Sequence, residues 1–220
     1  MANYSIFDIV GPIMIGPSSS HTAGASRIGF IASKLIRSKI ENVNFYLHGS
    51  FAKTYRGHGT DKAVLAGVLG IKEDDERLRD AFNIADKMGV TYSFEEIDLG
   101  DVHPNTVKIV VELENKATVE VVGSSIGGGA IEIIEINNIK LSITGENPTL
   151  IAKHGSLKGL IAGFANVLNQ NDYDIKYMSF YEGTSSSDGI IVVELDRFVT
   201  SEILDLIANS IDGIKDVFLI

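Results

Sequence analysis

The sequence predicts an α+β fold built as two units, and three observations carry this prediction. Apolar residues recur at helical spacing in several segments, strand-like runs lie between these segments, and in the first part of the chain helices and strands are segregated. A chain of 220 residues with 45% hydrophobic content can bury one core or two smaller ones. We place the boundary near Asn137-Asn138, which divides the chain into residues 1–137 and 138–220.

The N-terminal unit is expected to combine helices with a separate sheet. Helical spacing of apolar residues predicts helices at residues 25–39, 61–69 and 78–88. Strand-like runs are found at residues 43–48, 91–97, 106–114, 117–122 and 130–136. Asn115-Lys116 joins two of these runs like a hairpin. Residues 124–129 include three consecutive glycines, so we expect a loop there that admits close backbone approach.

The C-terminal unit reads as the order β-α-β-β-α-β. Strands are expected at residues 139–144, 174–182, 189–195 and 217–220. Helices are expected at residues 157–168 and 204–211, the second entered at Thr200 or Ser201. Residues 183–188 would close the hairpin between the two middle strands. This order within about eighty residues is typical of the split βαβ, or ferredoxin-like, arrangement.

The charge of the chain limits its expected partners. Its 29 acidic and 19 basic residues give a net charge of −10, and no long basic run interrupts them. This argues against nucleic acid and anionic membranes as partners and favours a small soluble ligand. The first residues lack a basic region followed by an apolar one, and the longest apolar stretch, residues 63–71, is too short to span a bilayer. We therefore expect a cytoplasmic protein.

The chain contains no cysteine. It can form no disulfide, and it offers no thiol nucleophile and no thiolate ligand for zinc or an iron–sulfur cluster. Its five histidines include no closely spaced pair, and no His-Glu-x-x-His run occurs. No metal site is predicted in this chain.

The most unusual segment is Gly16-Pro17-Ser18-Ser19-Ser20-His21-Thr22-Ala23-Gly24, directly before the first predicted helix. Backbone N–H groups at a helix start are unpaired and carry the positive end of the helix dipole, so they favour a bound carboxylate or phosphate. Three serines and a histidine beside them indicate a ligand loop that could hold an amino-acid carboxylate. The alternative is that Ser19 or Ser20 only caps the helix.

A second candidate segment, residues 49–61, leaves one predicted strand and enters the next predicted helix. His58 stands between two glycines and is easily approached, so its imidazole could act as a general base, oriented by Thr60 or Asp61. Equally, Thr60 and Asp61 could cap the helix while His58 faces solvent. Ser50 and Lys53 match a Ser-x-x-Lys pattern, which we discount because the companion Lys-Thr-Gly is absent.

A third candidate, Lys153-His154-Gly155, is expected between the first strand and the first helix of the C-terminal unit. A glycine-containing turn there could expose backbone donors to a small amino acid. A plain connection is the alternative. The exposed sheet edges of such units also tend to pair, so a homodimer is a competing use of the same region.

Three segments together carry a resemblance to a known family. They are Ser5-Ile6-Phe7-Asp8-Ile9-Val10-Gly11-Pro12, the Gly-Pro-Ser-Ser-Ser-His-Thr run at residues 16–22, and Gly57-His58-Gly59-Thr60-Asp61. They closely resemble the β subunit or β domain of iron–sulfur L-serine dehydratases, and the resemblance covers essentially the whole chain. By this resemblance residues 1–137 look like the allosteric-substrate-binding domain of that family, and residues 138–220 look like an ACT domain.

The resemblance implies a lyase that converts L-serine to pyruvate and ammonia in amino-acid degradation and gluconeogenesis, under allosteric control. A 4Fe-4S cluster on a separate α subunit would bind the serine hydroxyl, and the absence of cysteine here fits this two-chain form. The chain would bind no cofactor by itself and would be inactive alone. Its expected partners are the α subunit, L-serine as substrate or effector, and a second copy through one or both domains.

The resemblance also assigns roles to residues of this chain. His58 is the candidate base or proton relay, and His21 could exchange roles with it. The residues that would hold substrate or shape the subunit junction are Ser18, Ser19, Ser20 and Thr22. An effector would bind at Lys153, His154 and Gly155, although these replace the acidic or Asn-bearing glycine turn of some ACT domains.

Two other classes of function are kept open. One is a purely regulatory amino-acid-binding module that joins an unrelated enzyme or transporter. The other is a self-sufficient hydrolase that uses a serine of residues 18–20 with His21 or His58. The hydrolase is the weakest of the three because no Gly-x-Ser-x-Gly elbow occurs in the sequence.

Overall fold

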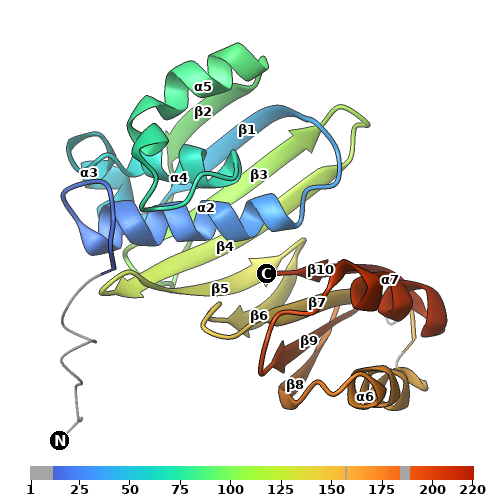
Figure 1. The fold of residues 1–220 in the computed structure, drawn as a ribbon. Coiled ribbons are helices and arrows are strands. Elements are labelled where there is room, and N and C mark those ends of the chain that lie inside the picture. The colour runs from blue at the N-terminus through green and yellow to red at the C-terminus, as the bar shows by residue number, and fades with distance from the viewer. Residues whose placement is uncertain (1–11, 157, 184–188) are drawn as a thin grey trace, which may run out of the picture. The chain divides into compact units, whose positions relative to one another are not determined.

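The computed structural model describes residues 12–156, 158–183 and 189–220. Within them the chain combines helices with two β-sheets, which confirms the predicted α+β class. It divides into two compact units, Met1–Asn137 and Asn138–Ile220, whose elements are labelled in Figure 1. None of the described helices is both long and apolar enough to cross a bilayer.

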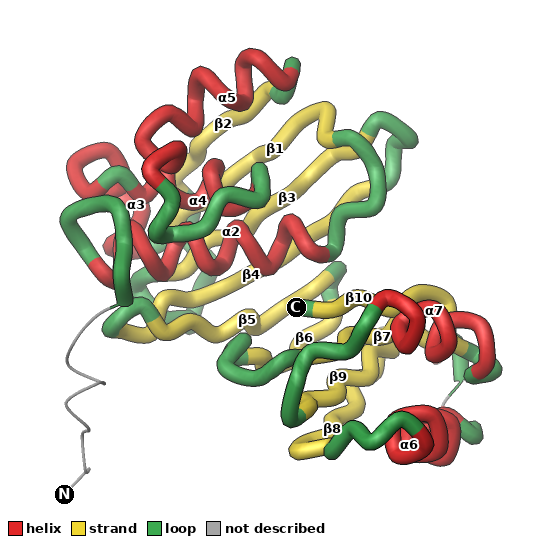
Figure 2. The backbone as a smooth tube through the Cα atoms, viewed as in Figure 1, coloured by secondary structure: helices red, strands yellow, loops and turns green. Residues whose placement is uncertain are grey.

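The larger sheet has six strands in the order β2-β1-β3-β4-β5-β6 (Figure 2). The bounds are β1 Ile40–Leu47, β2 Thr91–Glu96, β3 Thr106–Leu113, β4 Thr118–Gly127, β5 Ala130–Ile136 and β6 Ile139–Ile143. β1 pairs with β2 in parallel, whereas the β1–β3, β3–β4 and β4–β5 pairs are antiparallel. The predicted hairpin at Asn115-Lys116 is confirmed, and Lys116 takes the positive φ of 65° that such a tight turn uses.

Helices cover one face of this sheet, as Figure 1 shows for α2, α4 and α5. Their bounds are α2 Ala25–Lys34, α3 Gly49–His58, α4 Thr60–Val68 and α5 Ala81–Met88, with short turns η1 Ser19–Gly24 and η2 Glu76–Asp80. Alternate residues of β1 are buried, among them Val43, Phe45 and Leu47. Burial of one face is typical of mainly antiparallel sheets, so the core of this unit lies between the sheet and its helices.

Two glycines allow α2 and α4 to touch backbone to backbone. A Cβ atom added to Gly67 would lie 2.1 Å from the Ser26 carbonyl oxygen, and one added to Gly29 would lie 2.3 Å from the Val64 carbonyl oxygen. Any larger residue at either position would therefore push the two backbones apart. The sequence contains both glycines, but we did not predict the crossing from them.

The structure corrects three predictions in this unit. Residues 49–58, expected to connect a strand to the next helix, form α3, in which Phe51 and Ala52 are buried and both glycines lie at or next to the helix ends. The predicted loop at 124–129 is shorter, since β4 continues to Gly127 with a register shift between Ser125 and Gly127. The helix predicted at 25–39 ends early, at Lys34.

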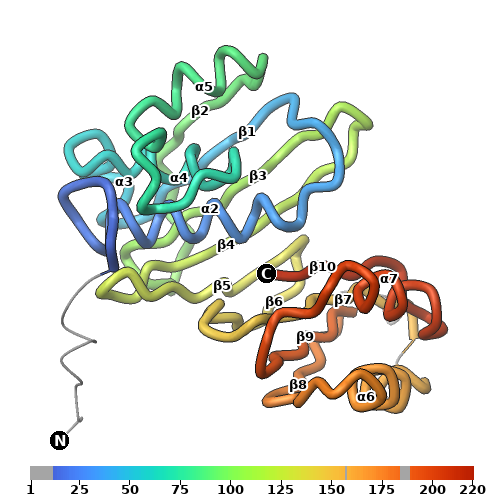
Figure 3. The backbone as a smooth tube through the Cα atoms, in the orientation of Figure 1, coloured from blue at the N-terminus to red at the C-terminus, as the bar shows by residue number. Residues whose placement is uncertain are grey.

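Besides β6, which pairs in the larger sheet, the second unit contains, in chain order, β7 Thr149–His154, α6 Leu160–Gln170, β8 Ile175–Glu182, β9 Gly189–Leu195, α7 Ser201–Ser210 and β10 Ile214–Leu219. Figure 3 follows this order along the chain by colour. The four strands form one sheet in the order β10-β7-β9-β8, and all three pairings are antiparallel. α7 begins after Thr200, as predicted.

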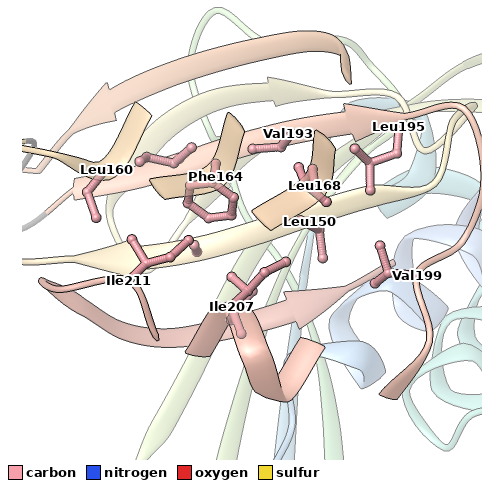
Figure 4. Close-up of a cluster of buried hydrophobic side chains, with 12 residues drawn as sticks. Leu150, Leu160, Phe164, Leu168, Val193, Leu195, Val199, Ile207 and Ile211 are labelled. Carbon is pink, nitrogen blue, oxygen red and sulfur yellow. The ribbon is translucent and has the colours of Figure 1, made fainter. Parts of the chain in front are cut away.

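The core of the second unit lies between its helices and its sheet. Phe164 and Leu168 of α6 and Ile207 of α7 are fully buried among side chains of β7 and β9, as Figure 4 shows. Burying a side chain of this size contributes about 1.5–3 kcal/mol. The helical spacing of the apolar residues therefore identified the correct faces of both helices.

The first strand of this β-α-β-β-α-β order was predicted wrongly. Residues 139–144 do form a strand, β6, but it lies beside β5 in the larger sheet. The strand of the smaller sheet is β7, whose run Leu150-Ile151-Ala152 is fully buried. A short, wholly apolar run of this kind is typical of a central strand, and we had treated it as a connection. The predicted positions Leu157 and 184–188 lie outside the described residues.

Candidate functional site

The serine-rich segment begins a helix. Ser19–Gly24 forms a single wide π-helical turn that continues into α2, and Ser18 caps it, because its Oγ accepts a hydrogen bond from the His21 backbone N–H at 3.1 Å. The Ser18 carbonyl also accepts the Thr22 N–H at 2.9 Å. Capping thus falls on Ser18 and not on Ser19 or Ser20. This hydrogen bond fixes the backbone position from which the His21 side chain projects.

His58 is the last residue of α3. Gly59 follows it in the left-handed conformation, with φ of +69°, and its N–H bonds to the Tyr55 carbonyl to close the helix. The Thr22 hydroxyl donates a 3.0 Å hydrogen bond to the His58 carbonyl. The serine-rich turn and the end of α3 are thereby tied together.

The two candidate histidines lie against each other. The ring centroids of His21 and His58 are 4.8 Å apart, with a tilt of 41°. The His21 Nε2 atom lies 3.0 Å from the Ser50 Oγ atom, and its ring meets the Phe51 ring edge-on at 5.4 Å. The fold therefore brings together two residues that the sequence placed in separate motifs.

His58 also faces a surface pocket of about 470 Å³. The pocket is lined by residues 52–58 of α3 and by Glu96 at the end of β2. Lys53 and Arg56 contribute positive charge to its wall and Glu96 contributes negative charge, so a small zwitterionic ligand suits it. Of the two histidines, His58 lines this pocket and His21 does not.

Burial lowers the pKa of His21 below its ordinary value of 6.5, and the charge of His58 lowers it further. A second proton on this pair of rings is therefore unfavourable. Burial acts in the opposite direction on Asp61, whose pKa is raised, although the Lys62 N–H donates to its Oδ1 at 2.8 Å. Asp61 is the second residue of α4, whose N-cap is Gly59 and which has no side-chain capping hydrogen bond, so the alternative of a cap at Thr60 or Asp61 is wrong.

The His21 shift predicts an acid-sensitive fold. Unfolded chains take up the His21 proton near pH 6.5 but the folded chain does so only at lower pH, so the unfolded state binds more protons in the window just below pH 6.5. The free energy of unfolding should fall as the pH drops through that window. Urea unfolding at about pH 8 and about pH 5.5 should show a smaller fall for His21→Gln than for the parent chain. Equal falls in both proteins would contradict this assignment.

Gly59 should be needed for its conformation and not for space. An added Cβ would meet no atom within 4 Å among the described residues, so the cost of Gly59→Ala is the left-handed backbone alone, about 1–2 kcal/mol. Gly59→Asn should cost roughly half as much, because asparagine tolerates this region. Urea midpoints measure both. Identical midpoints for the alanine variant and the parent would show that the helix end is not held as described.

The glycine-rich end of β4 lies against the serine-rich turn. Gly24 of η1 packs on Ser125, such that an added Cβ would lie 2.1 Å from its hydroxyl oxygen. Arg27 Nη1 donates a 2.8 Å hydrogen bond to the Gly129 carbonyl, and Arg27 Nε pairs with Glu73 at 3.3 Å. The expected close backbone approach in residues 124–129 is thus made to the serine-rich turn.

Ser50 and Phe51 were not predicted as site residues. Ser50 was considered only as part of a Ser-x-x-Lys pattern, and nothing in the local sequence connects it to His21. The sequence feature that could have identified Ser50 is its position close after a strand end, because functional side chains often lie where a strand leads into a helix. Its hydrogen bond to His21 spans 29 residues of sequence.

Lys153 and His154 do not lie in a turn. Both belong to strand β7, and only Gly155 follows it, with its N–H bonded to the Gly213 carbonyl at 3.0 Å. His154 is buried and packs on Gly189, where an added Cβ would lie 2.6 Å from its ring. The Lys153 ammonium lies 5.6 Å from the Phe218 ring centroid. The predicted turn is therefore wrong, because the apolar run before it extends the strand.

Comparisons with known proteins give consistent findings. Residues 5–89 match the family described as "Serine dehydratase beta chain", a span that includes His21, Ser50 and His58. The chain is 40% identical over 204 residues to "L-serine dehydratase, beta chain" of Peptoniphilus asaccharolyticus, covering 92% of both chains. It is 42% identical over 201 residues to "Probable L-serine dehydratase, beta chain" of Bacillus subtilis (strain 168), covering 91% of both.

A longer relative is also similar. "L-serine dehydratase" of Helicobacter pylori (strain J99 / ATCC 700824) is 31% identical over 183 residues, which cover 73% of this chain but 40% of that protein. The similarity is thus to one part of a protein that extends well beyond the matched region.

Proposed function

Because this chain belongs to the L-serine dehydratase β-chain family, we propose that it completes and regulates an L-serine ammonia-lyase that converts L-serine to pyruvate and ammonia. The observation that carries this proposal is the pair of His21 and His58 at 4.8 Å beside a pocket whose wall holds both cationic and anionic side chains. Loss of the α proton of serine needs a base, and a neutral imidazole is suited to that role near neutral pH.

In this proposal the iron–sulfur cluster of the enzyme is held by a partner subunit. The chain has no cysteine, and the described residues contain no group of three or more histidine or acidic side chains that could hold a metal ion. The residues of this chain therefore do not fit a 4Fe-4S cluster, and cysteines of an α subunit would hold it. The β-chain names of the relatives and the greater length of the Helicobacter pylori relative support a separate α subunit.

Within this proposal His58 acts as the base or proton relay, and His21 could exchange roles with it. The pocket supports His58 as the group nearer to substrate, since His58 lines it. Ser18, Ser19, Ser20 and Thr22 would hold substrate or shape the subunit junction. The Ser18 and Thr22 side chains also have structural hydrogen bonds, so their substitution would disturb His21 and His58 directly.

The finer structural assignments belong to the same proposal. We infer an allosteric-substrate-binding-like domain in residues 1–137 and a ferredoxin-like ACT domain in residues 138–220, supported by the order of β7 to β10 and their sheet order. Allosteric control by L-serine, an effector site at Lys153, His154 and Gly155, a homodimer through one or both domains, and a cytoplasmic location remain predictions.

The test is pyruvate formation from L-serine under anaerobic conditions, with this chain alone and mixed with a cluster-loaded α subunit. Activity only in the mixture is expected. Turnover by the metal-free chain alone would overturn the proposal. Failure of the two chains to associate, with no activity in either sample, would favour a regulatory amino-acid-binding module of another enzyme.

A further inference from the structure

Ser50 has an anchored backbone at the start of α3. Its N–H donates a 2.7 Å hydrogen bond to the Pro104 carbonyl. The preceding Gly49 has φ of +57° and lies so close to Pro104 that an added Cβ would be 2.6 Å from the same carbonyl oxygen. The Ser50 carbonyl in turn accepts the Thr54 hydroxyl at 2.8 Å. The reach of the Ser50 side chain is therefore set by the fold.

Three groups contact the His21 ring, and the contacts are of two kinds. Phe51 and His58 contact the ring by packing, with centroids at 5.4 Å and 4.8 Å. The Ser50 hydroxyl lies 3.0 Å from Nε2, at hydrogen-bond distance. Of these three groups, the hydroxyl is the one that hydrogen-bonds the ring, and it can donate to Nε2 or accept from it.

A neutral imidazole has one donor and one acceptor nitrogen, and a serine hydroxyl can pair with either, so the contact holds the position of the ring in both tautomers. His58 cannot be ordered in this way from its Nδ1 side, because that atom is buried without a hydrogen-bond partner among the described residues. The fixed end of the His21–His58 pair is therefore the contact with Ser50.

We propose that Ser50 is a positioning residue that holds the His21 ring in one orientation against His58. The inference rests on the proposed function, in which this pair moves the proton of the substrate. Ser50 acts through His21 and is not itself a catalytic residue. Its hydroxyl limits the rotation of the His21 ring, and with it the direction of the nitrogen that does not contact Ser50.

The first test uses the full chain and needs no activity. Nuclear Overhauser contacts from the ring protons of His21 to those of Phe51 and His58 at about pH 7.5 report the orientation of the His21 ring. One set of contacts is expected in the parent chain and in Ser50→Thr, which keeps the hydroxyl. Ser50→Ala should weaken these contacts, because the His21 ring then samples further orientations. An unchanged His21 pattern in Ser50→Ala overturns the proposal.

The second test uses the complex with the α subunit. Ser50→Ala should lower kcat for L-serine by about tenfold with little change in KM, the effect expected for losing one hydrogen bond that aligns a reacting group. Ser50→Thr should restore most of the activity. A loss that threonine does not restore would point to packing and would overturn the positioning role.

The two proposals fail in different ways. If the orientation of the His21 ring changes in Ser50→Ala and returns in Ser50→Thr, while the parent complex forms no pyruvate, the role of Ser50 stands and the proposed function fails. If the parent complex is active but neither the ring orientation nor kcat responds to Ser50→Ala, the function stands and the role of Ser50 fails.

Discussion

Replacing His58 by glutamine should lower kcat of the complex with the α subunit by about 10²- to 10⁴-fold, the range typical of a lost general acid or base. Glutamine is polar and of similar reach, but it cannot take up a proton near neutral pH. The hydrogen bond from Thr22 should survive, because it is made to the backbone carbonyl of residue 58. The loss should therefore reflect chemistry and not unfolding.

The matched control for this variant is His103→Gln, at an exposed histidine whose Nδ1 accepts the Asn105 N–H at 3.1 Å. It should keep kcat within about twofold, since surface substitutions away from a site have small effects. Initial rates of pyruvate formation measure both variants, and thermal unfolding of each chain reports folding. A His58→Gln complex with parental kcat and only an altered response to added L-serine would support the regulatory module instead.

Gly67→Ala should destabilise the chain by about 3 kcal/mol, at the upper end of the usual cost of overpacking. The added Cβ would lie 2.1 Å from the Ser26 carbonyl oxygen and 2.7 Å from the Phe30 backbone nitrogen. Both atoms belong to the backbone of α2, so no side-chain rotation relieves the clash. The helices must separate, and the core between them and the sheet opens.

The control is Gly57→Ala, also within a helix, where an added Cβ would meet no described atom within 4 Å. Alanine is the better helix former, so this variant should be neutral or more stable by about 0.5–1 kcal/mol. Thermal unfolding should show a midpoint lowered by roughly 6 °C or more for Gly67→Ala and not for Gly57→Ala. Similar midpoints for the two variants would show that the helices are not in backbone contact.

Much of the fold could be predicted because the spacing of apolar residues indicates which side of a helix or strand is buried. The faces of α2, α6 and α7 followed from helical spacing, and the strands β2, β3, β8 and β9 followed from short apolar runs between turns. α3 was missed because its glycines outweigh its few apolar residues. β7 was missed because a wholly apolar run has no period, so only tertiary context separates a central strand from a connection.

The site was predicted in parts. His21 and His58 stand out because each lies among glycines or hydroxyl residues at the edge of an element. Their contact could not be predicted, since it depends on how α3 ends and how the turn before α2 is capped. Ser50 lies outside both motifs, and its bond to His21 exists only once the strand and helix around it have folded.

The backbone contact between α2 and α4 also bears on dynamics. With no side chain between them at Gly29 and Gly67, neither helix can roll or slide without carrying the other. The turn that holds His21 leads directly into α2, and only Gly59 separates His58 from the start of α4. The two imidazoles are therefore attached next to the ends of two helices that move together. The distance between them should be kept when other parts of the unit unfold locally. Amide hydrogens at this crossing should exchange with solvent only when the whole unit unfolds.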